Sequence, residues 1–586
     1  MARIAASGKL GSMHDFDLHA PWPSQADAVP VSKRGRDLIR DPLLNKGTAF
    51  RADERERFRL HGLLPSRQIS MDLQVQRNVA SIDRAATPLD QYLRLSALQD
   101  RNEHLYYRVL AENLDRFLPI VYTPTVAEAT RNFSQVFRRA RGVWLTPDFR
   151  GRMARVLSDA AGDEPVRLIV ATDNESILGI GDQGAGGMAI CVGKLALYTV
   201  AAGIPPAATL PVSLDVGTDN PDLLGDSMYV GWREPRLRGA EYDDFVAEFV
   251  DAVAMVFPKA LLQWEDLRKD IALRVADRYR TRLPSFNDDI QGTGAVALAG
   301  LLGSGRVTGT RLSEQRVVVH GAGAAGLGIV RQIRAAMRLE GLSEAQCVER
   351  VAALDSRGLL VADREQRDAY KRDLAWPPSL VQALGIGAER GLDAVVRAFR
   401  PTALVGTSGQ KGCFTESIVR AMARGCERPV VLPFSNPSDL SEATPADLLR
   451  WTDGRALVAT GSPFAPVDVG GRTVRVGQGN NVLVFPGLGL GVLLGGLRTV
   501  TDEMLTAAAF TLAGKVTDAE LASGMLFPAV TRLREVSAAV AAAVIATARG
   551  RDVREPPSPA LVDAVAAKMW VPRYEEYVAV ASDAAE

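Results

Sequence analysis

The spacing of apolar residues changes along the chain, and each change predicts a different kind of secondary structure. Between residues 51 and 139 apolar side chains recur at helical intervals, as Leu89, Tyr92, Leu93 and Leu98 do. From Val166 onward, short β-branched runs alternate with longer helical stretches. Such alternation is typical of helices that cover a parallel sheet. The pattern therefore predicts an α/β fold that follows an N-terminal helical region.

The expected strands form two groups, and each group predicts one α/β unit. The first group comprises residues 166–172, 209–214 and 260–264. The second comprises residues 316–320, 351–354, 403–406, 430–433 and 456–460. Helical spacing returns between residues 498 and 550, so we expect the chain to end in helices that pack back on the earlier units.

Composition narrows the class of protein. A chain of 586 residues needs several cores, and Lys+Arg and Asp+Glu both number 69, so no net charge attracts nucleic acid or an anionic membrane. The four cysteines form no CxxC pair, as is usual in a reducing compartment. Residues 1–20 lack the apolar core of an export signal, and the uncharged run 482–497 is shorter than the ~20 residues of a membrane span. We therefore expect a cytoplasmic enzyme without a nucleic-acid or membrane partner.

Four carboxylates lie at two neighbouring element ends. Glu265 and Asp266 close an expected buried strand, and Asp288 and Asp289 open a helix expected over residues 290–302. Ligands of open α/β sheets gather at such ends, and oxygen ligands favour Mg²⁺ or Mn²⁺ over Zn²⁺. The spacing alone leaves two interpretations open: a metal site, or a helix cap at Asp288 beside solvated acids.

A glycine-rich turn follows the expected strand 316–320 and opens a helix expected over residues 327–337. Its glycines are Gly321, Gly323 and Gly326, with Ala324 between the last two. In this context glycine lets the backbone approach a pyrophosphate at the helix start, so the turn predicts a dinucleotide site. A glycine turn without a ligand is the alternative.

The preference between the two nicotinamide dinucleotides stays open at this point. Asp355 ends the next expected strand, where an acid holds the ribose hydroxyls of NAD. Arg357 follows closely and is suited to the 2′-phosphate of NADP. We expect NAD to be preferred, because the carboxylate of Asp355 would repel the phosphate.

Lys194 lies inside an apolar helical run, residues 188–197. Burial there would lower the pKa of the ammonium group and suit it to act as a base, whereas a lysine that extends to the surface is the alternative. A phosphate-binding loop is excluded because Met188 and Leu195 replace the glycine and the hydroxyl residue that this motif requires.

Two asparagines follow expected strand ends. Asn436 precedes Pro437, and Asn481 follows Asn480. Both patterns are typical of turns. Their positions also suit hydrogen bonding to a carboxylate substrate.

Taken in order, these motifs resemble the malic enzyme family over about residues 45 to 545. The resemblance rests on the segments Asn45–Phe50, Gly62–Pro65, Tyr122–Val126, Ile177–Asp182, Leu214–Thr218, Trp264–Asp266, Phe286–Thr293, Ser435–Pro437 and Gly479–Asn481. It implies oxidative decarboxylation of (S)-malate to pyruvate and CO₂ with reduction of NAD or NADP. It also implies a requirement for Mg²⁺ or Mn²⁺ and a homodimer or homotetramer.

The resemblance also implies a role for each matching residue. Lys194 resembles the general base and Tyr122 the general acid of the family, with Asp288 holding Lys194. Glu265, Asp266 and Asp289 resemble the metal ligands. Asn436 and Asn481 resemble residues that contact malate.

With these roles, the expected fold has five parts. They are an N-terminal helical region (1–140), an α/β substrate and metal domain (141–288), a Rossmann-type NAD(P)-binding domain (289–480), a return to the substrate domain (481–550) and a C-terminal tail (551–586).

Two departures from the family pattern bear on specificity. Ser176 stands where many members have an arginine that pairs with a substrate carboxylate, so we expect weak malate binding or another cation in the pocket. In the glycine turn, Ala324 replaces a frequent acid and Gly326 a frequent alanine, which bears on cofactor placement.

Two other functions compete with this one. A malolactic enzyme converts malate to lactate with bound NAD on the same scaffold, and release of NADH would distinguish the two. A non-catalytic dinucleotide-binding protein is the alternative from another class. A lack of malate turnover in the presence of Mn²⁺ would identify such a protein.

Overall fold

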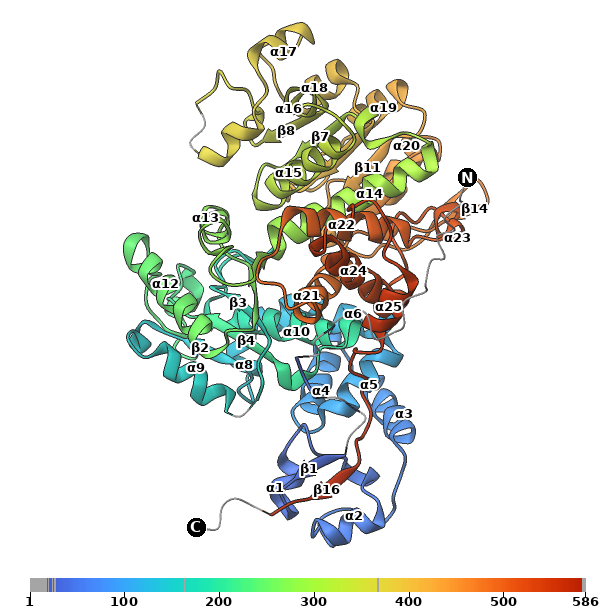
Figure 1. Cartoon of the computed structure of the whole chain (residues 1–586). Coiled ribbons are helices and arrows are strands. Elements are labelled where there is room, and N and C mark those ends of the chain that lie inside the picture. Colours follow the sequence, from blue (N-terminus) through green and yellow to red (C-terminus); the bar gives the residue numbers. More distant parts are fainter. Residues whose placement is uncertain are drawn as a thin grey trace, which may run out of the picture.

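The structure is a computed structural model that describes residues 18, 21–23, 25, 28–162, 164–365 and 368–581. Two α/β units, each built on a sheet of mainly parallel strands, lie one above the other (Figure 1). The N-terminal helices lie below them, and the last helices pack beside both units. This arrangement confirms the predicted fold class. Apart from Leu18, the segment 1–20 used above to argue against export lies outside the described residues.

The N-terminal part is helical, as the spacing of apolar residues predicts. Its helices are α1 (Gly35–Arg40), α2 (Ala52–Arg57), α3 (Met71–Ile82), α4 (Pro88–Gln99), α5 (Glu103–Glu112), α6 (Leu114–Val121), α7 (Thr125–Arg131) and α8 (Phe133–Val136). Helices α5 and α7 contact α10 (Met188–Ala202), so this region packs directly on the helix that carries Lys194.

The lower α/β unit contains a five-stranded parallel sheet in the order β2-β4-β3-β5-β6. Its strands are β2 (Val143–Leu145), β3 (Leu168–Thr172), β4 (Thr209–Leu214), β5 (Leu261–Glu265) and β6 (Ser285–Asn287). Its helices besides α10 are α9 (Met153–Ala161), α11 (Pro221–Gly225), α12 (Gly239–Val256) and α13 (Lys269–Tyr279). Every residue of β3 and β5 is buried, because elements cover both faces of the sheet.

The upper unit contains a seven-stranded sheet in the order β15-β12-β11-β10-β7-β8-β9, in which only β9 runs antiparallel to its neighbour. Its strands are β7 (Val317–His320), β8 (Val351–Asp355), β9 (Gly358–Leu359), β10 (Ala403–Gly406), β11 (Val430–Pro433), β12 (Leu457–Thr460) and β15 (Gly477–Gln478). A small hairpin joins β13 (Val467–Val469) and β14 (Arg472–Val474). Its helices are α14 (Thr293–Thr308), α15 (Ala324–Leu339), α16 (Glu344–Arg350), α17 (Pro378–Ala383), α18 (Leu392–Phe399), α19 (Glu416–Gly425) and α20 (Pro445–Trp451).

The helix expected over residues 290–302 differs in one respect that matters for the site. Asp288–Gly292 forms a π-helical turn, and α14 begins only at Thr293. A wide turn of this kind is frequent at functional sites. It places the two neighbouring acids, Asp288 and Asp289, against different partners, which are described below.

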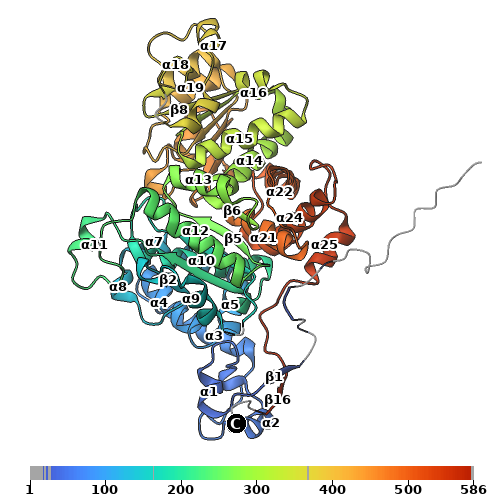
Figure 2. The ribbon, with the colours of Figure 1, turned by 60° about the vertical axis from the view of Figure 1, so that its left-hand side comes forward.

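The last helices return to the lower unit and close it. They are α21 (Phe485–Leu494), α22 (Asp502–Gly514), α23 (Asp518–Ala522), α24 (Leu533–Ala548) and α25 (Pro559–Ala566). Helices α21 and α24 both contact α10, and α22 contacts α14 (Figure 2). The apolar run 482–497 is thus a buried helix that packs against the helix of Lys194.

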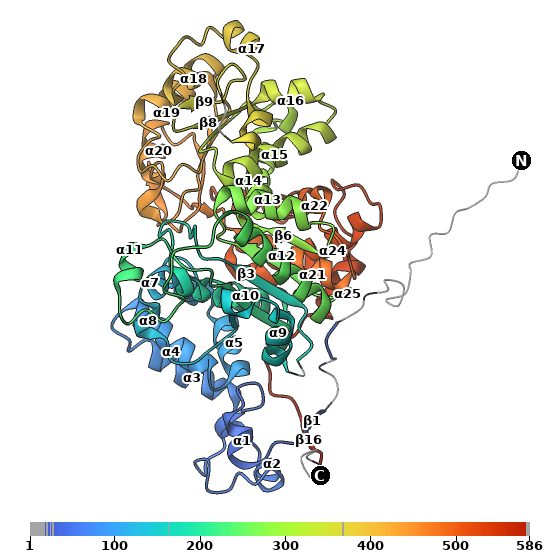
Figure 3. The same ribbon diagram turned by 90° about the vertical axis from the view of Figure 1, so that its left-hand side faces the viewer.

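The two ends of the described chain meet, which the apolar pattern did not predict. β1 (Val29–Val31) pairs in parallel with β16 (Tyr577–Ala579) beside the N-terminal helices (Figure 3). Tyr577 is buried there between Phe50 and Phe58, at ring-centroid distances of 6.3 and 6.2 Å. The tail expected over residues 551–586 therefore contributes a helix and a strand to the fold.

One segment, Gly184–Ala202, is long and apolar enough to cross a membrane by length and composition. In the structure 94% of its most apolar window is buried inside the protein. Its apolar character is accounted for by packing against β3, β4, α21 and α24.

We predict that Gly328→Ala destabilises the protein. A Cβ at this position of α15 would lie 1.9 Å from the backbone oxygen of Ile290, so α15 and the π-helical turn must separate. Overpacking of this kind costs about 1–3 kcal/mol, and we expect a lower melting temperature in a thermal unfolding experiment. Gly514→Ala is the matched control, because nothing lies within 4 Å of a Cβ added there. Equal melting temperatures for the two variants would contradict the prediction.

Candidate active site

The centre of the candidate site is Lys194, which is buried at 1% exposure. Its ammonium group lies 2.7 Å from Oε1 of Glu265 and also donates to Oδ2 of Asp288. The alternative in which this lysine reaches the surface is therefore wrong. Three elements meet at one cation: α10, the end of β5 and the turn that precedes α14.

Close approach of these elements depends on small residues. A Cβ at Gly193 would lie 2.6 Å from the backbone oxygen of Val121, so glycine lets α10 lie against the end of α6. Tyr122 follows Val121, and its ring centroid lies 5.7 Å from the Lys194 nitrogen. The centroid of the Phe485 ring lies 4.7 Å from the same nitrogen. The predicted acid and base are thus neighbours inside an aromatic enclosure.

Glu265, Asp266 and Asp289 form a compact carboxylate cluster, with one oxygen from each within 4.8 Å of the others. The backbone N–H of Asp266 donates to Asp289 at 2.9 Å, and Asp266 has a positive φ of 55°. Oδ2 of Asp266 is buried without a hydrogen-bond partner. The cluster presents oxygens that a hard divalent cation would satisfy.

Electrostatics also favour a cation at this cluster. Burial raises the pKa of Glu265 and Asp266 well above the ordinary range, and mutual repulsion among the acids raises it further. Burial raises the pKa of Asp289 to about 6. Two buried carboxylates and a third that is partly buried cannot all be ionised at neutral pH unless positive charge lies between them. The residues present therefore fit a divalent ion.

The pKa expected for Lys194 is not the one that the structure gives. Burial alone lowers the pKa of this ammonium group, but attraction by Asp288 and Glu265 outweighs burial and raises it well above the ordinary value. The apolar run around Lys194 gave no sign of this, because both acids come from other parts of the chain. Lys194 is held charged until that attraction is reduced.

Asn481 lies beside Asp288 instead of apart from it. Its amide nitrogen lies 3.1 Å from both Oδ2 and the backbone oxygen of Asp288, and 3.1 Å from Oγ1 of Thr293. Oδ1 of Asp288 is buried without a partner. Asp288 is therefore fixed between Lys194 and Asn481, and it shares the Lys194 ammonium group with Glu265 of the three-carboxylate cluster.

Asn436 belongs to a turn of the upper unit that contacts a loop of the lower unit. A Cβ at Gly179, which has φ +79°, would lie 2.6 Å from Cδ of Pro437 and 3.1 Å from the backbone oxygen of Asn436. The hydroxyl of Ser462 donates to Oδ1 of Asn436. The two units thus meet next to the carboxylate cluster, since Ser176, in the same loop as Gly179, donates its N–H to the backbone oxygen of Asp266 at 2.9 Å.

The glycine turn has the geometry expected for close packing. Gly321 has φ +119°, and a Cβ there would lie 2.5 Å from the backbone of Thr407. A Cβ at Gly326 would lie 1.9 Å from the backbone oxygen of Gly321. Gly323 has open space beside it, and Ala324 begins α15. The free side of the turn is therefore at Gly323, where a phosphate group has access to the helix start.

Asp355 is held by cations that the sequence analysis did not consider. Its Oδ2 accepts from Lys371 at 2.8 Å and from Arg364 at 3.0 Å, and its Oδ1 accepts from the N–H of Arg357 at 2.9 Å. The bond from Arg357 comes from its backbone, whereas the bonds from Lys371 and Arg364 come from their side chains. Lys371 and Arg364 are thus cations whose side chains bind the Asp355 carboxylate.

The surroundings of Ser176 contain two arginines from other segments. Ser176 itself is exposed, and the neighbouring Glu175 accepts from Arg238 at 2.6 Å and from Arg268 at 3.4 Å. Arg236 also contacts the segment of Ser176, because it donates to the backbone oxygen of Asp173 at 2.8 Å.

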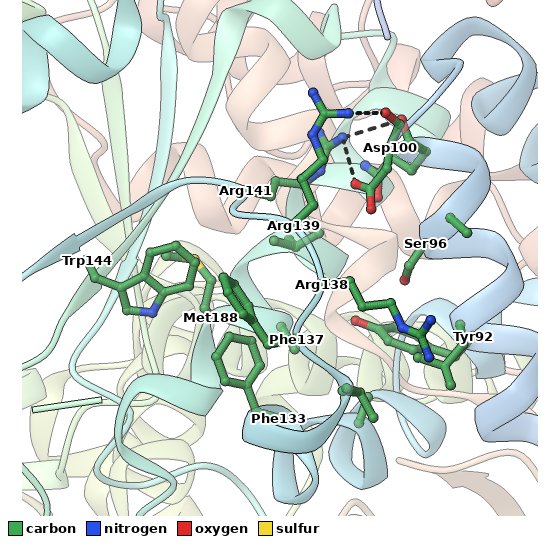
Figure 4. Close-up of a pocket in the computed structure, with 17 residues that line it drawn as sticks. Tyr92, Ser96, Asp100, Phe133, Phe137, Arg138, Arg139, Arg141, Trp144 and Met188 are labelled. Carbon is green, nitrogen blue, oxygen red and sulfur yellow. Dashed lines mark hydrogen bonds and ion pairs between the residues drawn. The ribbon is translucent and has the colours of Figure 1, made fainter. Parts of the chain in front are cut away.

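A separate cavity of about 110 Å³ lies between α4, α8 and the first turns of α10. Figure 4 shows Phe133, Phe137 and Trp144 on one side and Arg138 and Arg139 near α4. None of the predicted catalytic, metal or substrate residues lines it. This pocket is therefore distinct from the candidate active site.

Comparison with known proteins agrees with this geometry. The chain matches the malic enzyme N-terminal domain over residues 99–280 and the malic enzyme NAD-binding domain over residues 290–549. An NAD-dependent malic enzyme of Pseudomonas aeruginosa is 45% identical over 551 residues, covering 93% of this chain and 97% of that enzyme. The chain belongs to the malic enzyme family. Another member, the NAD-dependent malic enzyme of Sodalis glossinidius, is 46% identical over 549 residues, 93% of this chain and 97% of that enzyme.

Solved structures of the family share the fold. The malic enzyme of Entamoeba histolytica matches with a TM-score of 0.53 at 22% identity, covering 79% of this chain and 86% of that one. The malic enzyme of Pyrococcus horikoshii matches with a TM-score of 0.51 at 22% identity, covering 78% and 89%. At this identity the likeness concerns the fold alone.

We predict that Mn²⁺ stabilises the protein more at pH 7 than at pH 5. The pKa of Asp289 is raised to about 6 in the metal-free protein. A carboxyl group whose pKa is raised by folding stabilises the folded state below its unfolded value of ~4, and that contribution is lost as the pH rises through about 6. A bound cation offsets the loss at neutral pH.

The measurement is the rise in melting temperature on adding MnCl₂ to EDTA-treated protein at each pH. Because loaded and metal-free protein are compared at the same pH, the contributions of other titrating groups to the melting temperature cancel. One such group is His104, since burial lowers its pKa to about 4. Asp289→Asn should remove most of the Mn²⁺ effect. A rise that is equal at both pH values, or absent, would speak against a cation at the cluster.

Proposed function

We propose that this protein is an NAD-dependent malic enzyme that oxidises and decarboxylates (S)-malate to pyruvate and CO₂. The observation that supports the proposal best is the pairing of buried Lys194 with Asp288 and Glu265 directly beside the cluster of Glu265, Asp266 and Asp289. A buried amine next to a hard-cation site suits proton removal from a hydroxyl that the cation holds. Membership of the family and the NAD-dependent relatives agree with this reaction.

In the proposed reaction Lys194 first releases its proton to solvent, and its neutral amine then accepts the proton of the malate C2 hydroxyl while hydride leaves C2. Asp288, fixed by Asn481, keeps the amine directed at this position. Glu265, Asp266 and Asp289 would hold a divalent cation, which would supply the positive charge that polarises the C2 oxygen, weakens the hold of the carboxylates on the Lys194 proton and stabilises the negative charge left as CO₂ departs. The glycine turn would hold NAD, which would supply the acceptor of the hydride.

Tyr122 is suited to the second half of the reaction. Burial raises the pKa of its hydroxyl, so it stays protonated at neutral pH and can donate to C3 after CO₂ has left. Its closeness to Lys194 provides a route by which the proton taken from C2 is returned. The two residues would thus share one proton through the catalytic cycle.

Malate would be held from both units of the fold. Asn436, at the turn that contacts the Gly179 loop, and Asn481, beside Asp288, are the amides that we assign to the substrate. Arg238 and Arg268 are the candidate cations for a malate carboxylate, since Ser176 offers none. We further propose a cytoplasmic homodimer or homotetramer.

The first test is an assay of malate with NAD or NADP, with and without MnCl₂. We expect NADH and pyruvate to appear in equal amounts and only when a divalent ion is present. Lactate without release of NADH would indicate a malolactic enzyme instead. No turnover under any of these conditions would favour a non-catalytic dinucleotide-binding protein.

We predict that Lys194→Ala lowers kcat for malate oxidation by at least ~10², because a positioned base contributes that much or more. NADH binding, followed by nucleotide fluorescence, should be unchanged, since the glycine turn lies in the other unit. Lys515→Ala, which removes a partly exposed lysine paired with Glu535, is the control and should keep full activity. A kcat within threefold of the wild type would exclude Lys194 as the base.

We predict that Asp355→Ser raises the ratio of kcat/KM for NADP over NAD by at least ~10-fold, or about 1.4 kcal/mol. The substitution removes the charge that repels a 2′-phosphate and frees Lys371 and Arg364 to bind it. Asp363→Ser, at an acid of the same unit that pairs with Arg390, should leave the ratio unchanged. A ratio that does not move would place the ribose away from Asp355.

A further inference from the structure

A chain of buried hydrogen bonds extends from Glu265 away from Lys194. The side-chain amide of Gln263 donates from Nε2 to Oε2 of Glu265 at 2.8 Å. The hydroxyl of Tyr198 donates to Oε1 of the same glutamine. Gln263 and Tyr198 are both 0% exposed. Gln263 precedes Glu265 by two residues on β5, and Tyr198 follows Lys194 by four on α10. Neither residue has a role in the reaction proposed above.

The periodicity of the two elements explains the arrangement. Residues two apart on a strand share a face, so Gln263 and Glu265 point the same way from β5. Residues four apart on a helix also share a face, so Tyr198 lies next to Lys194 on α10. The two elements therefore contact each other through two pairs of polar groups, Lys194 with Glu265 and Tyr198 with Gln263.

The orientation of the amide is fixed by chemistry. Because an ionised carboxylate only accepts hydrogen bonds, the NH₂ group of Gln263 must face Glu265 and its carbonyl oxygen must face Tyr198. The Tyr198 hydroxyl must then donate. While Glu265 is ionised, no rotation of the amide preserves both bonds, so Oε2 of Glu265 has a neutral donor and Oε1 faces Lys194.

Packing also holds the tyrosine in one place. A Cβ at Gly489 of α21 would lie 2.6 Å from Cε1 of Tyr198, so the ring occupies space that only glycine leaves free. The ring also lies 4.8 Å, centroid to centroid, from Phe485, which is four residues before Gly489 on the same helix and also contacts Lys194. The Tyr198 hydroxyl is therefore directed at Gln263 by rigid neighbours.

We propose that Gln263 and Tyr198 are positioning residues that orient the carboxylate of Glu265 for a divalent cation. The inference rests on the metal site of the proposed function. A neutral amide holds one oxygen without adding positive charge that would compete with the cation, and the rotation of the carboxylate is set before the cation arrives. Outer partners of metal ligands contribute 10- to 100-fold in metal affinity by fixing the ligand in this way.

The test measures the Kd of MnCl₂ by the electron paramagnetic resonance signal of free Mn²⁺, in the absence of malate and NAD. Gln263→Met keeps the length of the side chain and removes the donor, so we expect the Kd to rise about 10- to 100-fold. Tyr198→Phe removes only the hydroxyl, and the Kd should rise less. The double variant should bind Mn²⁺ no more weakly than Gln263→Met, because both residues act through one chain of bonds.

Tyr577→Phe is the matched control, since this buried hydroxyl donates to the backbone oxygen of Leu44 at 3.0 Å, far from the site. It should leave the Kd of Mn²⁺ unchanged, and all variants should keep the NAD affinity of the wild type. The inference is overturned if Gln263→Met and Tyr198→Phe bind Mn²⁺ within twofold of the wild type, or if their effects add. A wild type that binds no Mn²⁺ would instead overturn the metal site and the proposed function with it.

Discussion

The buried contact of Lys194 with Asp288 and Glu265 is the interaction on which the site depends. A charge at 1% exposure is tolerated only when opposite charges and hydrogen bonds surround it. Meeting that condition requires α10, β5 and the turn before α14 to converge on one point. The small residue Gly193 and the covering helices α21 and α24 make the convergence possible. Much of the lower unit can therefore be understood as packing that encloses one ammonium group.

The same turn connects the carboxylates to the nucleotide unit. Asp288 and Asp289 lie in the π-helical turn, and α15, which starts at the glycine turn, packs against it through Gly328. A Cβ at Gly294 of α14 would lie 2.7 Å from the backbone oxygen of Gly328, so the two helices cross at backbone contact. α15, the helix at which the pyrophosphate would bind, thus packs against the π-helical turn. That turn carries Asp289, which belongs to the carboxylate cluster, and Asp288, which holds Lys194. The contact of α15 with the turn and the contact of the Gly179 loop with Pro437 fix how the two units lie relative to each other.

Sequence reasoning reached the parts of this structure that depend on local pattern. The β-branched runs located β4, β10 and β11 at their observed bounds, because buried parallel strands have a simple signature. Pairing between distant segments has no such signature. The parallel contact of β1 with β16 joins residues hundreds of positions apart and could not be predicted. The family resemblance named Asp288 as the partner of Lys194, but the apolar run around Lys194 indicated a lowered pKa, which is opposite to the shift that Asp288 and Glu265 produce. Gln263 was within reach, since alternation along β5 places it on the face of Glu265, but a buried glutamine beside a ligand is recognised only when its partner is known.

The positions of the four acids in space, and not their order in the sequence, divide them into two groups. Glu265, Asp266 and Asp289 form the carboxylate cluster, whereas Asp288 pairs with Lys194. Fully ionised, Glu265, Asp266, Asp288 and Asp289 with Lys194 carry a net charge of −3, which a buried site does not sustain. A divalent cation brings the total to −1, and the hydrogen bonds of Gln263 and Asn481 distribute part of what remains. Glu265 is the only acid that faces both the cation cluster and Lys194. The orientation of Glu265 therefore decides how strongly a bound cation would alter the attraction between Glu265 and Lys194. Gln263 fixes this orientation as a neutral donor, so it does not weaken that effect.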